Sequence, residues 1–135
     1  MASAHYGVYN PKDCEVTVDG VSITGFSEDL VSSGKSEDWF SVTVGAKGDT
    51  VKNMIYNKLG EVSLHLHATS PSVPFLRGLS GQPEDFPVWI TNKSLQIRCG
   101  GTTAAIKTAP PFDQGKEVGT QTFVFQVFDY TEEAI

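Results

Sequence analysis

Basic residues are few in this sequence. Its 135 residues include 10 Lys and Arg against 16 Asp and Glu, which gives a formal net charge of −6 and a pI near 4.9. A protein that binds nucleic acid through the phosphates presents a basic face and an excess of positive charge. The charge balance therefore argues against a general nucleic-acid binder.

Long apolar runs are absent as well. The opening stretch MASAHYGVYNPKD has no basic start followed by an apolar segment, so it does not read as a secretory signal. No stretch approaches the roughly 20 apolar residues that a helix needs to cross a bilayer. We therefore expect a protein that is made and kept in the cytoplasm and has no membrane partner.

Cysteine is scarce, and its two occurrences form no motif. Cys14 and Cys99 lie far apart in the sequence, outside any CxxC pair, each in a strand-like context. We expect two small residues in or near a core. A disulfide between them is the alternative.

Motifs for catalysis or cofactor binding are also missing. His65 and His67 lie two residues apart on one strand face, but the third histidine, His5, is in a separate arm, and no carboxylate or cysteine completes a metal set. The sequence contains neither a GxxxxGK[ST] phosphate loop nor a GxSxG elbow. Acidic pairs such as Glu28-Asp29 and Glu37-Asp38 are typical of solvated loops. We expect no enzyme, no metal site and no cofactor.

The composition of the sequence is that of a globular domain, with 39% hydrophobic and 10% aromatic residues. Its length suits one domain over residues 1–135, with a core large enough to fold without disulfides or metals. Residues 1–13 contain Tyr6 and Tyr9 but are too short and irregular for a core of their own. We expect this arm to dock on something.

Alternation of apolar and polar residues is the dominant pattern. In residues 15–26 it runs on both sides of Asp19-Gly20, a dipeptide that favours a type I′ hairpin turn, and places Val16, Val18, Val21 and Ile23 on a buried face. The last strand has apolar residues on both faces, so either it is central or a partner covers one face. The other expected strands span residues 38–46, 50–56 (or a short helical turn), 61–68, 86–91, 94–99, 102–108 and 120–130.

One helix is expected between these strands. Ser70 can cap it, Pro71 suits its first turn, and apolar residues at helical spacing continue to Gly81. Residues 27–38, rich in serine and acidic residues, read as a loop. The fold class is therefore mainly β: an antiparallel β-sandwich or barrel of seven or eight strands with one short flanking α-helix.

Short motifs follow one another in a particular order over most of the chain. They are Tyr9-Asn10-Pro11-Lys12, Val16-Thr17-Val18, Gly20, Ile23-Thr24-Gly25-Phe26, Gly45-Ala46-Lys47-Gly48, Gly60-Glu61-Val62, Leu66, Thr69-Ser70-Pro71, Phe86-Pro87-Val88, Ala104-Ala105-Ile106 and Pro111. In this order they resemble the tail tube proteins of contractile-tailed bacteriophages. The type VI secretion tube and phage-tail-like bacteriocins look to share the same general fold.

The resemblance implies a structural protein of the virion tail, assembled in the bacterial host cytoplasm. It would form stacked homohexameric rings whose lumen conducts the genome during ejection. The implied partners are copies of itself, the tail sheath, baseplate and tail terminator proteins, and the tape measure protein and DNA that pass without specific binding. The alternatives are a tube of a bacteriocin or secretion system and, in a different class, a monomeric β-barrel that binds a small ligand or a hydrolase using His65 or His67.

A tube of this kind needs a lumen face and contact surfaces. We expect polar and acidic side chains in the lumen, because they would keep phosphates from sticking during passage. The expected lumen residues are Ser41, Thr43, Ser63, His65 and His67. Contacts between subunits or rings are expected in the arm, in residues 27–38 and in the turn at 45–50, at Tyr6, Tyr9, Glu28, Asp29, Glu37, Lys47 and Asp49.

Overall fold

The computed structural model describes residues 4–112 and 114–135. This part of the chain contains ten β-strands, one α-helix and one short 3₁₀ helix. In chain order they are η1 Pro11–Asp13, β1 Cys14–Val18, β2 Val21–Ser22, β3 Phe26–Lys35, β4 Phe40–Val44, β5 Thr50–Met54, β6 Gly60–His67, α1 Ser72–Leu79, β7 Phe86–Asn92, β8 Ile97–Thr108, β9 Thr120–Val127 and β10 Thr131–Ala134.

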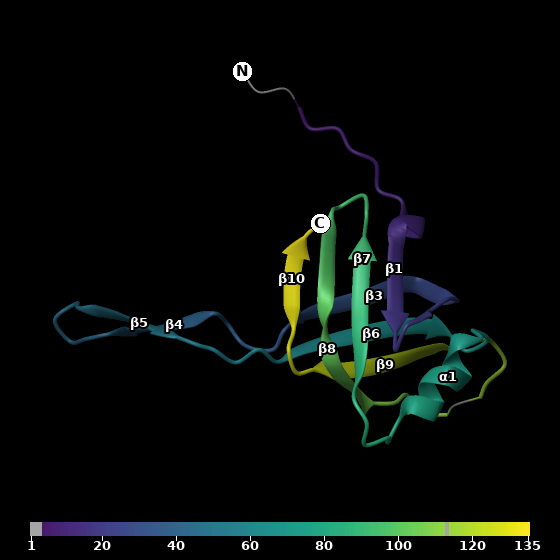
Figure 1. Ribbon diagram of the computed structural model, residues 1–135. Helices are drawn as coiled ribbons and strands as arrows, with labels where there is room; N and C mark the ends of the chain where they lie inside the picture. The colour runs from purple at the N-terminus through teal and green to yellow at the C-terminus, as the bar shows by residue number, and fades with distance from the viewer. Residues whose placement is uncertain (1–3, 113) are drawn as a thin grey trace.

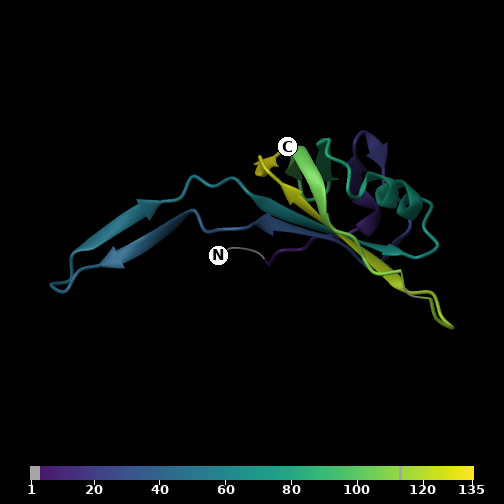
Figure 2. The same ribbon diagram turned by 90° about the horizontal axis from the view of Figure 1, so that it is seen from below.

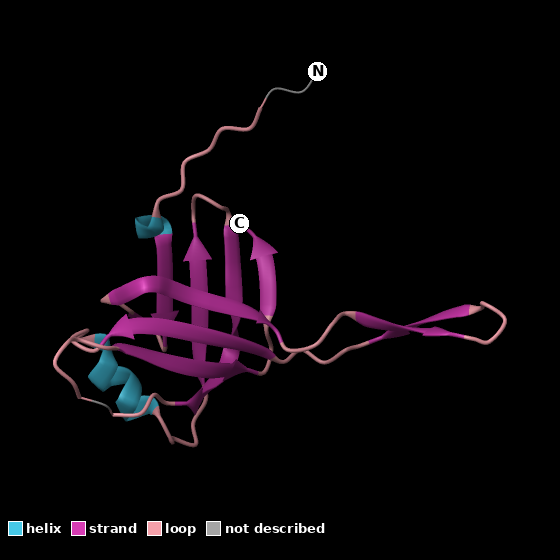
Figure 3. Ribbon diagram, turned by 180° about the vertical axis from the view of Figure 1, so that it is seen from behind, coloured by secondary structure: helices cyan, strands magenta, loops and turns pink. Residues whose placement is uncertain are grey.

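The strands form two crossed layers (Figures 1 and 3). One sheet has the order β2-β1-β7-β8-β9-β6-β3, with β10 also paired to β8, and all pairs are antiparallel. In the figures β1, β7 and β10 run across the direction of β3, β6 and β9. The predicted mainly β fold with antiparallel sheets and one helix is confirmed.

Strand β8 belongs to both layers. Its first part pairs with β7 and β10, and its last part pairs with β9. At the bend, Gly100 has φ +132°, and a Cβ there would overlap the Val88 carbonyl of β7. Only glycine fits so close an approach of two backbones. The sequence pattern predicted two strands here, 94–99 and 102–108, because the Gly100-Gly101 pair resembles a turn.

The core fills the space between the layers. Phe123 and Phe125 of β9 are completely buried, and Phe125 meets Phe86 edge to face with ring centroids 6.1 Å apart. These rings lie among aliphatic side chains of every long strand except β4 and β5. The other large side chains that are fully buried are Val16, Val18, Val62, Leu64, Leu66, Leu76, Val88 and Val127.

Helix α1 covers one end of this core. The N-cap position is Pro71, not the predicted Ser70. Ser70, one residue earlier, still accepts the Ser72 N–H at 3.1 Å and donates to the Thr24 carbonyl, so its side chain ties the start of the helix to the segment after β2. From the last turn, Arg77 donates to Gln121 Oε1 at 2.7 Å and to the Pro110 carbonyl at 3.1 Å. The predicted helix is confirmed, and it ends before Gly81.

The opening hairpin is confirmed in its turn and only partly in its burial. Asp19 and Gly20 have φ of 52° and 80°, as a type I′ turn requires, and Val18 pairs with Val21. Ile23 is buried, but Val21 is 45% exposed. The predicted burial of Val21 is wrong because β2 is a two-residue edge strand with no layer over that side chain.

The segment predicted as a loop at 27–38 is mostly strand β3. Residues 31–35 pair with residues 60–64 of β6 at the edge of the sheet. An edge strand needs only one paired side and tolerates serine, glycine and lysine, so its composition resembles that of a loop. The prediction was wrong because composition does not report the backbone pairing that a neighbouring strand supplies.

No helix within residues 4–112 and 114–135 has the length and apolar character needed to cross a membrane.

Candidate assembly surfaces

Strands β4 and β5 form a two-stranded hairpin that projects away from the body (Figures 1 and 2). Phe40 pairs with Met54 at its base, and Val44 pairs with Thr50 at its tip. The turn between the strands closes through a hydrogen bond from the Gly48 N–H to the Gly45 carbonyl at 3.0 Å. Both predicted strands are confirmed.

One side of this hairpin is apolar. We define the apolar face of the hairpin as Phe40, Val42, Val44 and Met54, which alternate along the two strands and are 46–65% exposed. The alternation in residues 38–46 places the first three on one strand face, and in the single chain that face is exposed. An isolated two-stranded hairpin is only marginally stable in water. An exposed apolar surface on such a hairpin is typical of a site that binds another protein.

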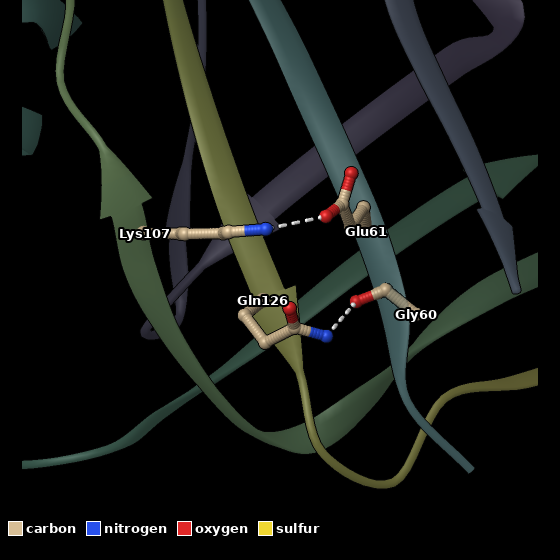
Figure 4. A network of polar contacts seen from close by, with 4 residues as sticks. All are labelled: Gly60, Glu61, Lys107 and Gln126. Carbon is tan, nitrogen blue, oxygen red and sulfur yellow. Dashed lines mark hydrogen bonds and ion pairs between the residues drawn. The ribbon is translucent and has the colours of Figure 1, made fainter. Parts of the chain in front are cut away.

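Strands β6 and β9 carry a second surface, on the side opposite the core. We call it the polar face; its members pair across the strands as Glu61 with Gln126, Ser63 with Val124, His65 with Thr122, and His67 with Thr120. The Lys107 Nζ lies 2.8 Å from Glu61 Oε1, and Gln126 donates to the Gly60 carbonyl at 2.9 Å (Figure 4). Because the one charged residue of these two strand faces is paired with Lys107, the polar face is close to neutral.

A third surface lies where the N-terminal arm passes β3. Phe26 pairs with Leu66 and Val31 with Leu64, so residues 27–30 bulge outward opposite His65 alone. Ser27 Oγ donates to the Asp29 carbonyl at 3.1 Å within this bulge. Between bulge and arm is an open groove of about 770 Å³, which we call the β3 groove.

The walls of the β3 groove differ in chemistry. Tyr9 and Pro11 of the arm, together with Leu30 and Val31 of β3, contribute apolar surface. Glu28 and Asp29 contribute carboxylates from the bulge, and both residues are exposed. The groove therefore combines apolar side chains with the two carboxylates of the bulge and with the polar side chains of Ser27, Ser32 and His65.

The structure brings together three of the five predicted lumen residues. Ser63, His65 and His67 lie on the polar face, where His65 Nδ1 is 3.1 Å from Thr122 Oγ1. Ser41 and Thr43 lie on the projecting hairpin, where Thr43 Oγ1 accepts from Asn53 Nδ2 at 2.9 Å. One chain therefore presents these residues as two separate surfaces.

The predicted contact residues fall on three segments. Tyr6 and Tyr9 are in the arm and are 87% and 63% exposed, so the arm does not pack on the core of its own chain. Residues 1–3 of the predicted arm lie outside the described residues. The others are distributed between the β3 bulge and the hairpin with its base: Glu28 and Asp29 in the first, Glu37, Lys47 and Asp49 in the second.

Neither thiol is disposed to act as a nucleophile. Cys14 and Cys99 are both free. Burial raises the pKa of both thiols, Cys14 further through the charge on Cys99, and Cys99 further through Glu132. The reactive thiolate is thus disfavoured at neutral pH. Within the described part of the chain, no three His, Cys, Asp or Glu side chains are grouped closely enough to hold a metal ion.

No protein-family model and no curated protein sequence matches the chain. Solved structures do match it over nearly its whole length. The anti-feeding prophage cap, which terminates that particle's tube, aligns with a TM-score of 0.62 at 13% identity, covering 100% of this chain and 96% of that one. The chain has the fold of contractile injection system components.

Two further structures extend this likeness. The sheath/tube terminator of the PVC extracellular contractile injection system aligns with a TM-score of 0.63 at 12% identity, covering 98% of this chain and 100% of the other. A chain of the PVC sheath–tube complex aligns with a TM-score of 0.61 at 16% identity, covering 90% and 88%. At such low identity the likeness establishes the architecture, while contacts and roles depend on this chain's own side chains.

Two features of this fold were not predicted from the sequence. The β3 groove depends on the bulge at 27–30, and the only local signal for it is a polar stretch, Ser27-Glu28-Asp29, between Phe26 and Leu30. The neutrality of the polar face depends on Lys107 of β8 meeting Glu61 of β6, which are 46 residues apart. Neither pairing leaves a periodic trace in the sequence.

Proposed function

We propose that this chain is a structural, non-catalytic subunit that assembles with copies of itself into stacked rings forming the hollow tube of a contractile tail. The observation that carries the proposal is the projecting hairpin, whose apolar face is 46–65% exposed in the single chain. A copy of the same chain would bury that face and complete the hairpin. The fold likeness to injection-system components supports the proposal.

The polar face is the natural lining of such a tube. It carries hydroxyl, amide and imidazole groups, and its one carboxylate is paired with Lys107. A surface with little net charge gives a passing phosphate backbone few groups to bind, because that binding depends on lysine and arginine. In a phage tail the cargo is the genome with its tape measure protein; in a bacteriocin or secretion system it is protein effectors or ions. Cryo-electron density with a ring of Lys or Arg dominating the pore would contradict this lining.

In this role the chain contacts the tail sheath, the baseplate and the terminator proteins. It is located in the tail of the finished particle. Closed rings are expected because cyclic symmetry uses one heterologous contact repeatedly and leaves no free end within the ring. Six subunits per ring is what the resemblance to the tail tube proteins implies.

The first test is whether the purified chain assembles. Size-exclusion chromatography with light scattering and negative-stain imaging should show rings or tubes, and a clean monomer at millimolar concentration would refute the proposal in favour of a ligand-binding barrel. Val42→Asp places a charge on the apolar face of the hairpin and should abolish assembly. Leu95→Asp is the matched control, because Leu95 is equally exposed, at 55%, in the turn between β7 and β8.

A terminator or cap that ends a tube is the second candidate. Two of the matched structures are such proteins, and this chain covers 96% and 100% of their lengths. The same imaging separates the two roles. A tube subunit stacks into tubes whose length grows with concentration, whereas a terminator stops at a single ring and shortens tubes when added to them.

A further inference from the structure

We infer that the β4–β5 hairpin of one copy docks in the β3 groove of a second copy, with Lys47 and Lys52 facing Glu28 and Asp29. This inference rests on the proposed self-assembly and adds where the hairpin goes. The supporting observations are the position of the two surfaces in the molecule, their charges, and their matching apolar parts.

The two surfaces lie at opposite ends of β3. The bulge at 27–30 follows the start of the strand, and the hairpin leaves the body after its end at Lys35. Figures 1 and 2 show the hairpin pointing away from the body on that side. A projection at one end and a groove at the other make a head-to-tail contact between copies. Such a contact repeats from copy to copy, as a ring or tube requires.

The charges of the two surfaces are opposite. Residues 40–54 carry Lys47, Lys52 and Asp49, a net +1, so the remainder of a chain with net charge −6 carries −7. The hairpin is thus a locally basic projection on an acidic body. The lining of the β3 groove contains Glu28 and Asp29 and neither lysine nor arginine. Opposite charges at a rim mainly set the rate and the register of docking.

The apolar parts of the two surfaces match as well. Lys52 stands across from Val42 on the apolar face, and its Nζ lies 4.6 Å from the centre of the Phe40 ring. That face therefore presents apolar side chains with a cation among them. The groove presents Leu30 and Val31 beside the carboxylates of the bulge. Docking would cover apolar surface on both copies and place cations against carboxylates.

The N-terminal arm forms one side of the groove, and a docked hairpin would contact it and restrict its movement. Tyr9 lines the groove yet is 63% exposed in the single chain. With a hairpin seated beside it, the ring gains a second contact surface. Ordering of the arm on assembly is therefore part of the inference.

Charge reversal tests the inference directly. Glu28→Lys with Asp29→Lys should raise the protein concentration at which tubes or rings first form by about tenfold, because two attractive pairs become repulsive. Glu84→Lys with Asp85→Lys is the control: it is the same dipeptide in an exposed loop and should change that threshold by less than about twofold. Lys47→Glu with Lys52→Glu should match the groove variant.

Compensation then distinguishes pairing from a general charge effect. At a concentration between the wild-type threshold and the raised one, each reversed variant should stay unassembled alone and assemble when mixed with the other, because every hairpin then finds a groove of opposite charge on the other variant. Assembly of the mixture within about threefold of the wild-type threshold is the expected result. A mixture that stays monomeric overturns the inference.

Crosslinking gives an independent readout on the wild-type protein. A zero-length carbodiimide joins lysine to carboxylate, and a mixture of ¹⁴N- and ¹⁵N-labelled chains identifies links between copies. The expected product joins Lys47 or Lys52 of one chain to Glu28 or Asp29 of another. If the wild type assembles and neither this product nor the effect of charge reversal is seen, the groove is wrong while the tube function stands. If the wild type does not assemble, the proposed function itself fails.

Discussion

Removing the β4–β5 hairpin should abolish assembly and leave the fold of the body intact. The design replaces residues 40–54 by Asn-Gly, which suits a two-residue turn. Trp39 and Ile55 are the right points to join, because the Ile55 N–H already donates to the Trp39 carbonyl at 3.0 Å. The two flanking segments then continue from β3 to β6 as they do now.

The expected change in stability follows from loop length. The connection between Lys35 and Gly60 falls from 24 residues to 11. Loop-closure entropy scales with the logarithm of length, so the shorter loop should stabilise the folded monomer by about 0.7 kcal/mol. The hairpin contributes little of its own, since a lone two-stranded ribbon is marginal in water. For a domain of this size the midpoint of thermal unfolding should rise by about 2–4 °C.

Two measurements check this prediction together. Circular dichroism should show a cooperative transition at the same or a slightly higher temperature, and light scattering should show a monomer at concentrations where the wild type assembles. A midpoint lower by more than about 5 °C would mean that the hairpin contributes to the core, against the contacts described above. Tubes formed by the excised variant would refute the role of the hairpin in assembly.

Three further predictions concern the body. Phe125→Ala should cost about 3–5 kcal/mol in urea unfolding, because Phe125 is completely buried; a loss below about 1 kcal/mol would contradict the core packing. Gly60→Ala should lower the free energy of unfolding by about 1–3 kcal/mol or more, because its Cβ would overlap the Tyr130 ring. A urea midpoint equal to that of the wild type would show that this ring moves aside freely. Burial opposes the charge of Asp129, but hydrogen bonds from the Thr102 hydroxyl and backbone N–H groups outweigh it and lower the pKa below 3.8. Asp129→Asn should therefore reduce stability at pH 7, with a difference from wild type that shrinks as the pH falls through 3.8 and below; a constant difference down to pH 2 would contradict the assignment.

Local sequence signals predicted much of the fold. The alternation in residues 61–68 corresponds to β6, where Val62, Leu64 and Leu66 are fully buried. Asp19-Gly20 adopts the positive φ values of its predicted turn, and the Ser70 side chain accepts a backbone N–H at the start of the helix, one residue before the N-cap. These signals work because backbone dihedrals, side-chain alternation and capping bonds depend on residues close together in the chain.

The errors arose where a distant segment decides the outcome. Strand β3 was predicted as a loop because its pairing is supplied by β6, some 30 residues later. Strand β10 was not predicted at all: its four residues are all exposed and depend on β8 for pairing. The hairpin strands were predicted correctly, but alternation reports a face that is apolar and does not say what will cover it.

The candidate surfaces divide in the same way. Residue types pointed to Ser63, His65 and His67 as polar positions of one strand, and they do share one face. The contact residues were chosen because their segments lacked a core, which holds for Tyr9 and Lys47 in the single chain. Their grouping into a hairpin at one end and a groove at the other required the three-dimensional arrangement.

The sequence by itself determined which residues alternate, where the chain turns and where the helix lies, because these depend on interactions within a few residues. The tertiary structure alone decided that β8 bends at Gly100 to join both layers, and that β3 closes the edge of one of them. It also decided that β4 and β5 pair only with each other and project from the body. These features depend on which distant strands meet, and the free energy of those contacts is not encoded in any single segment.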